Sequence, residues 1–88
     1  MKRRSFAKRR DANEPEIVAA LEGIGATVIR LDPFDLLVGY QGRTHLIEVK
    51  TEKGRLKPAQ EALIESWRGS PLHIVRTVDE ALELVRAA

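Results

Sequence analysis

The chain has 88 residues, the length of one small domain, and 43% of them are hydrophobic, a normal fraction for a globular fold. It contains no cysteine, which excludes a disulfide framework and a thiolate metal site. No apolar run approaches the roughly 18 residues of a membrane span, and the charged N-terminus is unlike a secretory signal. We therefore expect a soluble cytoplasmic protein without a membrane partner.

The net charge of +2 conceals an uneven distribution. Residues 1–10 hold six of the 15 Lys and Arg residues and no acid, so residues 11–88 hold nine bases and 13 acids, a net charge of −4. We interpret residues 1–10 as a flexible basic arm and residues 11–88 as one folded domain. Such an arm suits phosphate contacts, through Lys8, Arg9 and Arg10, and it equally suits a solubilising role.

The first half of the domain predicts one helix and three strands. The helix runs from about Asp11 or Asn13 to Gly23, with Asn13 as N-cap and Pro15 in the first turn. Its apolar stripe consists of Ile17, Val18, Leu21 and Ile24. Strands are expected over residues 26–31, 35–40 and 43–51.

The second half predicts a helix, a strand and a helix. The helix from Pro58 to about Arg68 turns Leu63, Ile64 and Trp67 inward, and a strand covers residues 72–77. Thr77 and Glu80 form a capping box that opens the last helix. The order α-β-β-β-α-β-α predicts an α/β fold with a central mixed sheet flanked by helices. The strands at 35–40 and 43–51 are expected in its centre, covered on both sides.

A register argument brings two carboxylates together. If Gln41-Gly42 forms a two-residue hairpin loop, Tyr40 pairs with Arg43 and Asp35 lies opposite Glu48. Directly opposed residues share a face with Cβ atoms roughly 4.5–5.5 Å apart, where two carboxylates can share one Mg²⁺ or Mn²⁺ and would otherwise repel each other. A three-residue loop with a bulge would break this alignment and remains an alternative.

Three further residues belong to the same prediction. Lys50 lies two positions beyond Glu48 on the same face, within reach of a phosphate oxygen or a metal-bound water. Gln60 shares the inward face of the second helix, and Glu16 lies early in the first helix beside small residues that let it approach the sheet. The candidate DNA-binding residues outside the arm are Arg43, Lys53, Arg55 and Lys57.

These residues carry a family resemblance over about residues 14–77. Asp35 followed by Glu48-Val49-Lys50 resembles the PD-(D/E)xK nuclease signature, and Glu16 together with residues 54–60 resembles its VRR-NUC (virus-type replication-repair nuclease) branch. Phe34 stands where the family usually has a proline before the aspartate, with Pro33 one position earlier. Asp32 is therefore a rival ligand, and we favour Asp35 because it lies opposite Glu48.

The resemblance implies a restriction-endonuclease-like core and Mg²⁺- or Mn²⁺-dependent hydrolysis of DNA phosphodiesters. By this likeness Asp35, Glu48 and the carbonyl of Val49 hold the metal. Glu16 would hold a second metal or a metal-bound water. Lys50 would position or activate the attacking water, and Gln60 would orient Lys50 or the phosphate.

The resemblance also implies a biological setting and a substrate. Stand-alone members of this family resemble homodimeric, structure-specific endonucleases that cut branched DNA such as four-way (Holliday) junctions in DNA repair, here in a bacterial or phage-infected cell. One alternative is a nucleic-acid-binding module that does not cleave. The carboxylate pair argues against it, because a pure binder gains nothing from acids facing a phosphate backbone. The other is a nuclease of the same fold that acts on RNA or on DNA ends.

Overall fold

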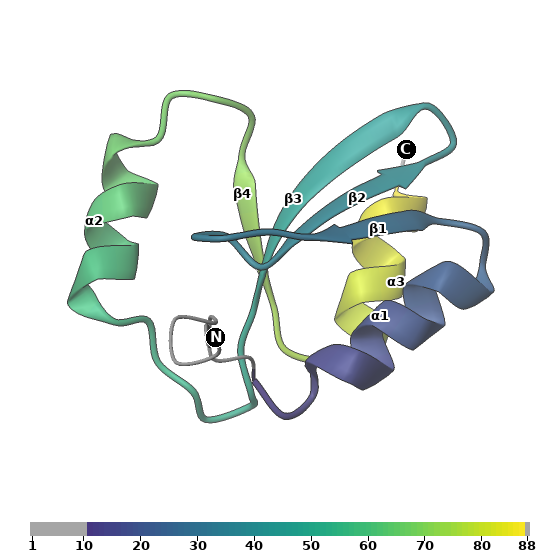
Figure 1. Cartoon of the computed structure of the whole chain (residues 1–88), viewed down its shortest axis with the longest axis horizontal. Helices are drawn as coiled ribbons and strands as arrows, with labels where there is room; N and C mark the ends of the chain where they lie inside the picture. The colour runs from purple at the N-terminus through teal and green to yellow at the C-terminus, as the bar shows by residue number, and fades with distance from the viewer. Residues whose placement is uncertain (1–10, 88) are drawn as a thin grey trace, which may run out of the picture.

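The computed structural model describes residues 11–87 and contains three helices and one four-stranded sheet (Figure 1). Residues 1–10, predicted as a basic arm, lie outside the described part. The elements in chain order are α1 (Glu14–Gly23), β1 (Thr27–Arg30), β2 (Leu36–Tyr40), β3 (Arg43–Val49), α2 (Pro58–Ser66), β4 (Leu72–Val75) and α3 (Val78–Arg86). The predicted element order and the mixed α/β sheet are confirmed: the strand order is β1-β2-β3-β4, with only β4 parallel to its neighbour.

The hairpin between β2 and β3 sets the register of the sheet. Gln41 and Gly42 have φ angles of 50° and 79°, as a two-residue type I′ turn requires. Tyr40 therefore pairs with Arg43, and the same alignment continues along the two strands. The predicted register is confirmed, although β2 begins one residue later than expected.

One face of the sheet, here termed the core face, is covered by α1 and α3 (Figure 1). Leu36 and Ile47 are directly paired on this face, and both are 0% exposed. Full burial of such a side chain contributes roughly 1.5–3 kcal/mol, so this face holds most of the hydrophobic stabilisation. The helices and strands contribute Ile17, Val18, Leu21, Val38, Val49, Val75, Ala81 and Val85 to the same cluster.

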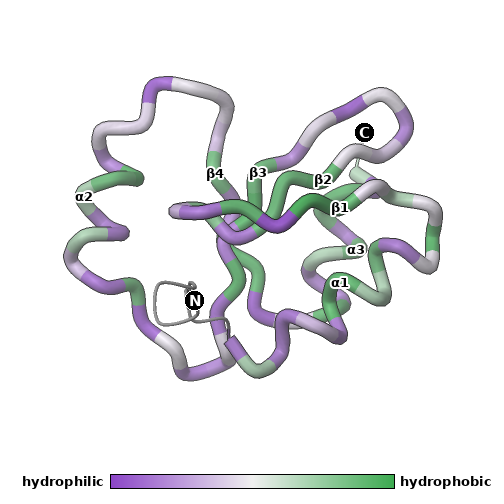
Figure 2. Tube along the Cα trace, in the orientation of Figure 1, coloured by the Kyte–Doolittle hydropathy of each residue, from purple (hydrophilic) through white to green (hydrophobic). Residues whose placement is uncertain are grey.

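The opposite face, here termed the site face, is covered only in part. No residue of α2 is buried, and Figure 2 shows hydrophilic and hydrophobic segments alternating along this helix. A pocket of about 100 Å³ separates α2 from the sheet and is bordered by Phe34, Leu63 and Leu72. The expectation that helices cover the central strands on both sides therefore holds for the core face and only in part for the site face, where α2 leaves this pocket.

Trp67 also departs from prediction. It was expected in the core, but it is 38% exposed at the end of α2. Its indole packs edge-to-face on Phe34, with ring centroids 5.1 Å apart, and its Nε1–H donates to the carbonyl of Ser70 over 2.6 Å. Gly69 is needed beside it, because a Cβ there would lie 2.6 Å from Trp67 Cζ2. Trp67 therefore anchors the end of α2 and lies outside the core cluster.

A row of apolar side chains crosses the site face. The register aligns Ile29 with Leu37, Leu37 with Leu46, and Leu46 with Leu72, so all four strands contribute one residue. Ile29 is 50% exposed and the other three are half-buried.

Among the described residues, no helix is long and apolar enough to cross a membrane.

Candidate metal centre

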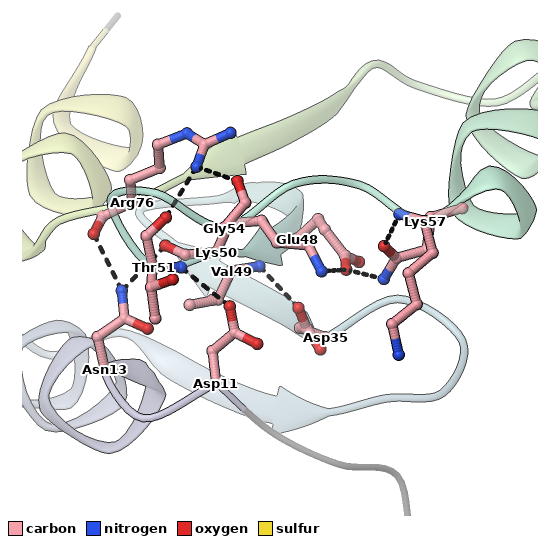
Figure 3. A network of polar contacts seen from close by, with 11 residues as sticks. Asp11, Asn13, Asp35, Glu48, Val49, Lys50, Thr51, Gly54, Lys57 and Arg76 are labelled. Carbon is pink, nitrogen blue, oxygen red and sulfur yellow. Dashed lines mark hydrogen bonds and ion pairs between the residues drawn. The ribbon is translucent and has the colours of Figure 1, made fainter.

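Asp35 is held at the point where the pairing of β2 and β3 ends. Because β2 begins at Leu36, the ladder no longer supplies an acceptor for the Val49 N–H, and the Asp35 side chain takes its place. Val49 N–H donates to Asp35 Oδ2 over 2.7 Å, and Asp35 is 4% exposed (Figure 3). This bond fixes a buried carboxylate at the end of the two central strands.

Glu48 lies beside Asp35 on the site face. Continuing the observed register by one residue sets Glu48 opposite Asp35, as predicted. Glu48 is 3% exposed, and its Oε2 accepts a hydrogen bond from Gln60 Nε2 over 2.7 Å. Lys50 Nζ lies 3.8 Å from the same oxygen, on a side chain that is 9% exposed. The structure thus brings Asp35, Glu48, Lys50 and Gln60 together; we refer to them as the candidate site.

The donor set of the candidate site suits a hard divalent cation. Two buried carboxylates and one ammonium leave a formal charge of −1, which a divalent ion would offset. Within residues 11–87, no group of three or more His, Asp or Glu side chains is arranged to hold a metal. Mg²⁺ commonly uses one or two carboxylates and completes its shell with water and substrate phosphates. Asp35, Glu48 and the carbonyl of Val49 fit that pattern.

The predicted DNA-binding residues divide into two places. Lys53, Arg55 and Lys57 are exposed on the loop that joins β3 to α2, directly after Lys50. Arg43 is exposed at the hairpin, five residues from Glu48, which corresponds to roughly 17 Å along a strand. Arg43 is therefore not part of the candidate site. Lys8, Arg9 and Arg10 precede the described residues.

The structure places the acids of α1 differently from expectation. Glu16 is exposed, whereas Glu14 is 1% exposed and its Oε2 accepts from Arg30 Nε over 3.0 Å. Sequence reasoning missed Glu14, although it lies three, four and seven positions before Ile17, Val18 and Leu21 and so shares their stripe. The rival ligand Asp32 is exposed, in contrast to Asp35.

Asp11, Asn13 and Arg76 were also missed as contacts of the site. Asn13 occupies the N-cap position of α1, as predicted, but its side chain makes no capping bond and reaches the carbonyls of Lys50 and Arg76 instead. Asp11 Oδ2 accepts from Thr51 N–H over 2.9 Å. These partners are separated by 37 or more positions, so local sequence patterns carry no signal for them.

His45 and His73 lie apart from the candidate site. Strand alternation places both on the core face with Ile47, on adjacent strands. Burial lowers the pKa of His45, and the nearby charges of His73 and Arg43 lower it further. Its Nε2 is buried without a hydrogen-bond partner. Both histidines are strand residues, His45 in β3 and His73 in β4.

Comparison of the chain with protein-family models, with curated proteins and with solved structures found no match. A hypothesis on the function of this chain therefore depends on the candidate site itself.

Proposed function

We propose that the protein is a metal-dependent, structure-specific DNA endonuclease with a restriction-endonuclease-like core, a member of the VRR-NUC branch of the PD-(D/E)xK nucleases. One observation carries the proposal: Asp35 and Glu48 are both buried, lie on one face of adjacent strands and have Lys50 beside them. Two adjacent buried carboxylates are costly in a sheet that has only a structural role. Together with a divalent cation they become a catalytic site.

The positions of the side chains support the following roles. Asp35, Glu48 and the Val49 carbonyl would hold Mg²⁺ or Mn²⁺, which when bound neutralises the phosphate and lowers the pKa of the attacking water. The Lys50 ammonium, 3.8 Å from Glu48 Oε2, would stabilise the developing hydroxide or contact a phosphate oxygen. Gln60 keeps the Glu48 carboxylate oriented through a 2.7 Å hydrogen bond.

The charge around the site supports a nucleic-acid substrate. Lys53, Arg55 and Lys57 are exposed on the loop that follows Lys50, and Lys8, Arg9 and Arg10 precede Asp11, whose carboxylate binds Thr51 N–H beside Lys50. Cations of this kind contact phosphates without reading bases. Selection by DNA shape, such as a four-way junction, is therefore the specificity that we propose.

The apolar row of the site face supports a homodimer. Ile29, Leu37, Leu46 and Leu72 form a stripe that a single chain leaves partly exposed, next to the row that contains Glu48. A symmetric dimer through this stripe buries the same patch of each copy. It would present two candidate sites to one branched substrate and produce paired cuts.

The catalytic proposal is tested with labelled single-stranded, duplex, flapped and four-way-junction DNA, with matched RNA substrates, with and without Mn²⁺. We expect metal-dependent cutting of the junction at internal positions, loss of cutting in Glu48→Gln, and full activity in Glu65→Gln, which changes an exposed acid of α2. Tight binding without cutting under any metal would replace the nuclease with a non-cleaving binding module. Preferred cutting of RNA or of ends would reassign the substrate.

The dimer is tested separately by sedimentation and junction mapping. We expect Leu46→Glu to shift the protein from dimer to monomer and to uncouple the two nicks in a junction. Ala19→Glu, on the exposed side of α1, is the control and is expected to remain a dimer. A wild-type protein that is monomeric at micromolar concentration would exclude this interface.

A further inference from the structure

The loop that follows Lys50 is tied to the turn between β4 and α3 by one side chain. Arg76 Nη1 donates to the carbonyls of Thr51 over 2.8 Å and Gly54 over 2.7 Å (Figure 3). It also makes a longer contact of 3.3 Å to the carbonyl of Glu52. Three main-chain acceptors of one short loop therefore converge on a single nitrogen.

The main chain of Lys50 is fixed from both sides, although β3 ends one residue earlier. Its N–H donates to the carbonyl of Val75 over 3.0 Å, and its carbonyl accepts from Asn13 Nδ2 over 3.0 Å. The same Asn13 nitrogen donates to the carbonyl of Arg76 over 2.9 Å. The side-chain amide of Asn13 thus joins Lys50, which carries the ammonium of the candidate site, to Arg76, which holds the following loop.

Arg76 is itself anchored to the folded core. Its N–H donates to Glu80 Oε1 over 2.6 Å, and Glu80 belongs to α3, whose Ala81 and Val85 are buried against the sheet. Asn13 directly precedes α1, which buries Ile17 and Leu21 in the same core. The position of the loop is therefore fixed relative to α1 and α3, the two helices of the core face. Both helices lie on the other side of the sheet from the candidate site.

We propose that Asn13 and Arg76 are positioning residues that set the place of Lys50 and of the basic loop at residues 51–57. Neither side chain needs to touch substrate: Asn13 acts on the Lys50 carbonyl, and Arg76 acts on the loop carbonyls. The loop carries Lys53 and Arg55, so the hydrogen bonds from Arg76 would also order these residues, which we propose to contact phosphates. The effect on catalysis rests on the proposed nuclease function, whereas the effect on loop order does not.

Loop order is measured by trypsin cleavage of the native protein without metal or DNA. The loop offers two scissile bonds, after Lys53 and after Arg55, whereas Lys57 precedes Pro58 and resists trypsin. Because cleavage tracks the open population of a segment, we expect Arg76→Met to speed cutting at both bonds by about tenfold or more. Arg76→Lys keeps an ammonium near the three carbonyls and should restore part of the protection.

Arg68→Met is the matched control, because Arg68 is exposed and donates only a 3.4 Å bond to a carbonyl three residues before it. We expect its loop to be cut at the wild-type rate. Equal loop cleavage in wild type and Arg76→Met would overturn the proposed role of Arg76, whether or not the protein is a nuclease.

Asn13→Ser tests the catalytic part. Serine is as good an N-cap as asparagine, so the start of α1 is retained while the bridge to Lys50 is lost. We expect kcat with Mn²⁺ to fall about tenfold or more with KM within about threefold, since a displaced ammonium affects the reaction more than binding. Unchanged kcat in both Asn13→Ser and Arg76→Met would overturn the positioning role. An inactive wild type would instead refute the nuclease proposal, and the trypsin result would still decide whether Arg76 orders the loop.

Discussion

Gln60 makes two hydrogen bonds that join α2 to the candidate site. Its Oε1 accepts from the Lys57 N–H over 2.9 Å, which caps the helix, and its Nε2 donates to Glu48 Oε2 over 2.7 Å. A glutamate at this position would serve the first bond equally well but not the second. The amide therefore explains how a helix without buried residues remains attached beside Glu48.

The first prediction concerns Gln60→Glu. The cap of α2 is preserved, but the new carboxylate faces Glu48, and a bond to a charged group worth about 1.5–3 kcal/mol is lost. We expect the free energy of unfolding to fall by about 1–3 kcal/mol and single-turnover cleavage to fall about tenfold or more. Urea denaturation and rapid-quench assays measure the two effects. Glu61→Gln, a neighbouring exposed residue, should change neither; wild-type behaviour of Gln60→Glu would contradict the role assigned to its amide.

The second prediction separates the charge of Asp35 from its hydrogen bond. In Asp35→Asn the side-chain oxygen still accepts from Val49 N–H, so we expect the free energy of unfolding to stay within about 1 kcal/mol of wild type. Removal of one carboxylate from the donor set should weaken Mn²⁺ binding about tenfold or more, as measured by calorimetry. Asp32→Asn changes the exposed rival and should bind Mn²⁺ normally. The reverse pattern would assign the metal to Asp32.

The third prediction compares Glu14 with Glu16. Glu14→Gln weakens a buried ion pair whose Arg30 partner is half exposed, so we expect a loss of stability of about 1–2 kcal/mol. Glu16→Gln changes an exposed residue and should stay within about 0.5 kcal/mol. Thermal unfolding measures both, and cleavage assays test the metal role that the resemblance gives Glu16. Reduced cleavage with intact stability in Glu16→Gln would uphold that role.

The fourth prediction is a pH dependence of stability from His45. Its pKa in the folded protein is below the ordinary value of 6.5, so the unfolded chain binds more protons at mildly acidic pH. The contribution is complete above about pH 6.5 and is lost as the pH falls through the folded pKa. We expect His45→Leu to flatten this part of the stability profile, measured by urea denaturation across pH 5–8. His73→Gln removes one of the lesser causes and should leave a smaller slope; an unchanged profile in His45→Leu would contradict the assignment.

Local chemistry accounts for the parts of the structure that sequence reasoning predicted. Gln41-Gly42 adopts the positive φ angles of a two-residue turn, and this turn alone determines that Asp35 and Glu48 share a face. Thr77 Oγ1 accepts from Glu80 N–H over 3.0 Å, which is one half of the predicted capping box, whereas Glu80 Oε1 accepts from Arg76 N–H instead of Thr77 N–H. Each of these features depends on residues within a few positions of one another.

The features that sequence reasoning did not predict involve contacts between segments that are distant in the sequence. Asn13 stands at the position of an N-cap, but its Nδ2 donates to the carbonyls of Lys50 and Arg76 and its Oδ1 makes no capping bond. These long-range contacts are visible only in three dimensions. Trp67 lies at helical spacing from Leu63 and Ile64, yet α2 does not pack closely enough to bury it. Periodicity indicates which side chains share a face, and it carries no information on how closely that face is packed.

The bond from Thr51 N–H to Asp11 has a practical consequence for protein engineering. Because Asp11 Oδ2 lies 2.9 Å from the N–H of Thr51, the residue next to Lys50, a tag or label fused directly before Asp11 would be attached beside the candidate site. By contrast, α3 begins beside Arg76 and runs nine residues, or about 13 Å, before it ends at Arg86. Immobilisation through the C-terminus therefore keeps surfaces, resins and dyes farther from the region where substrate would bind.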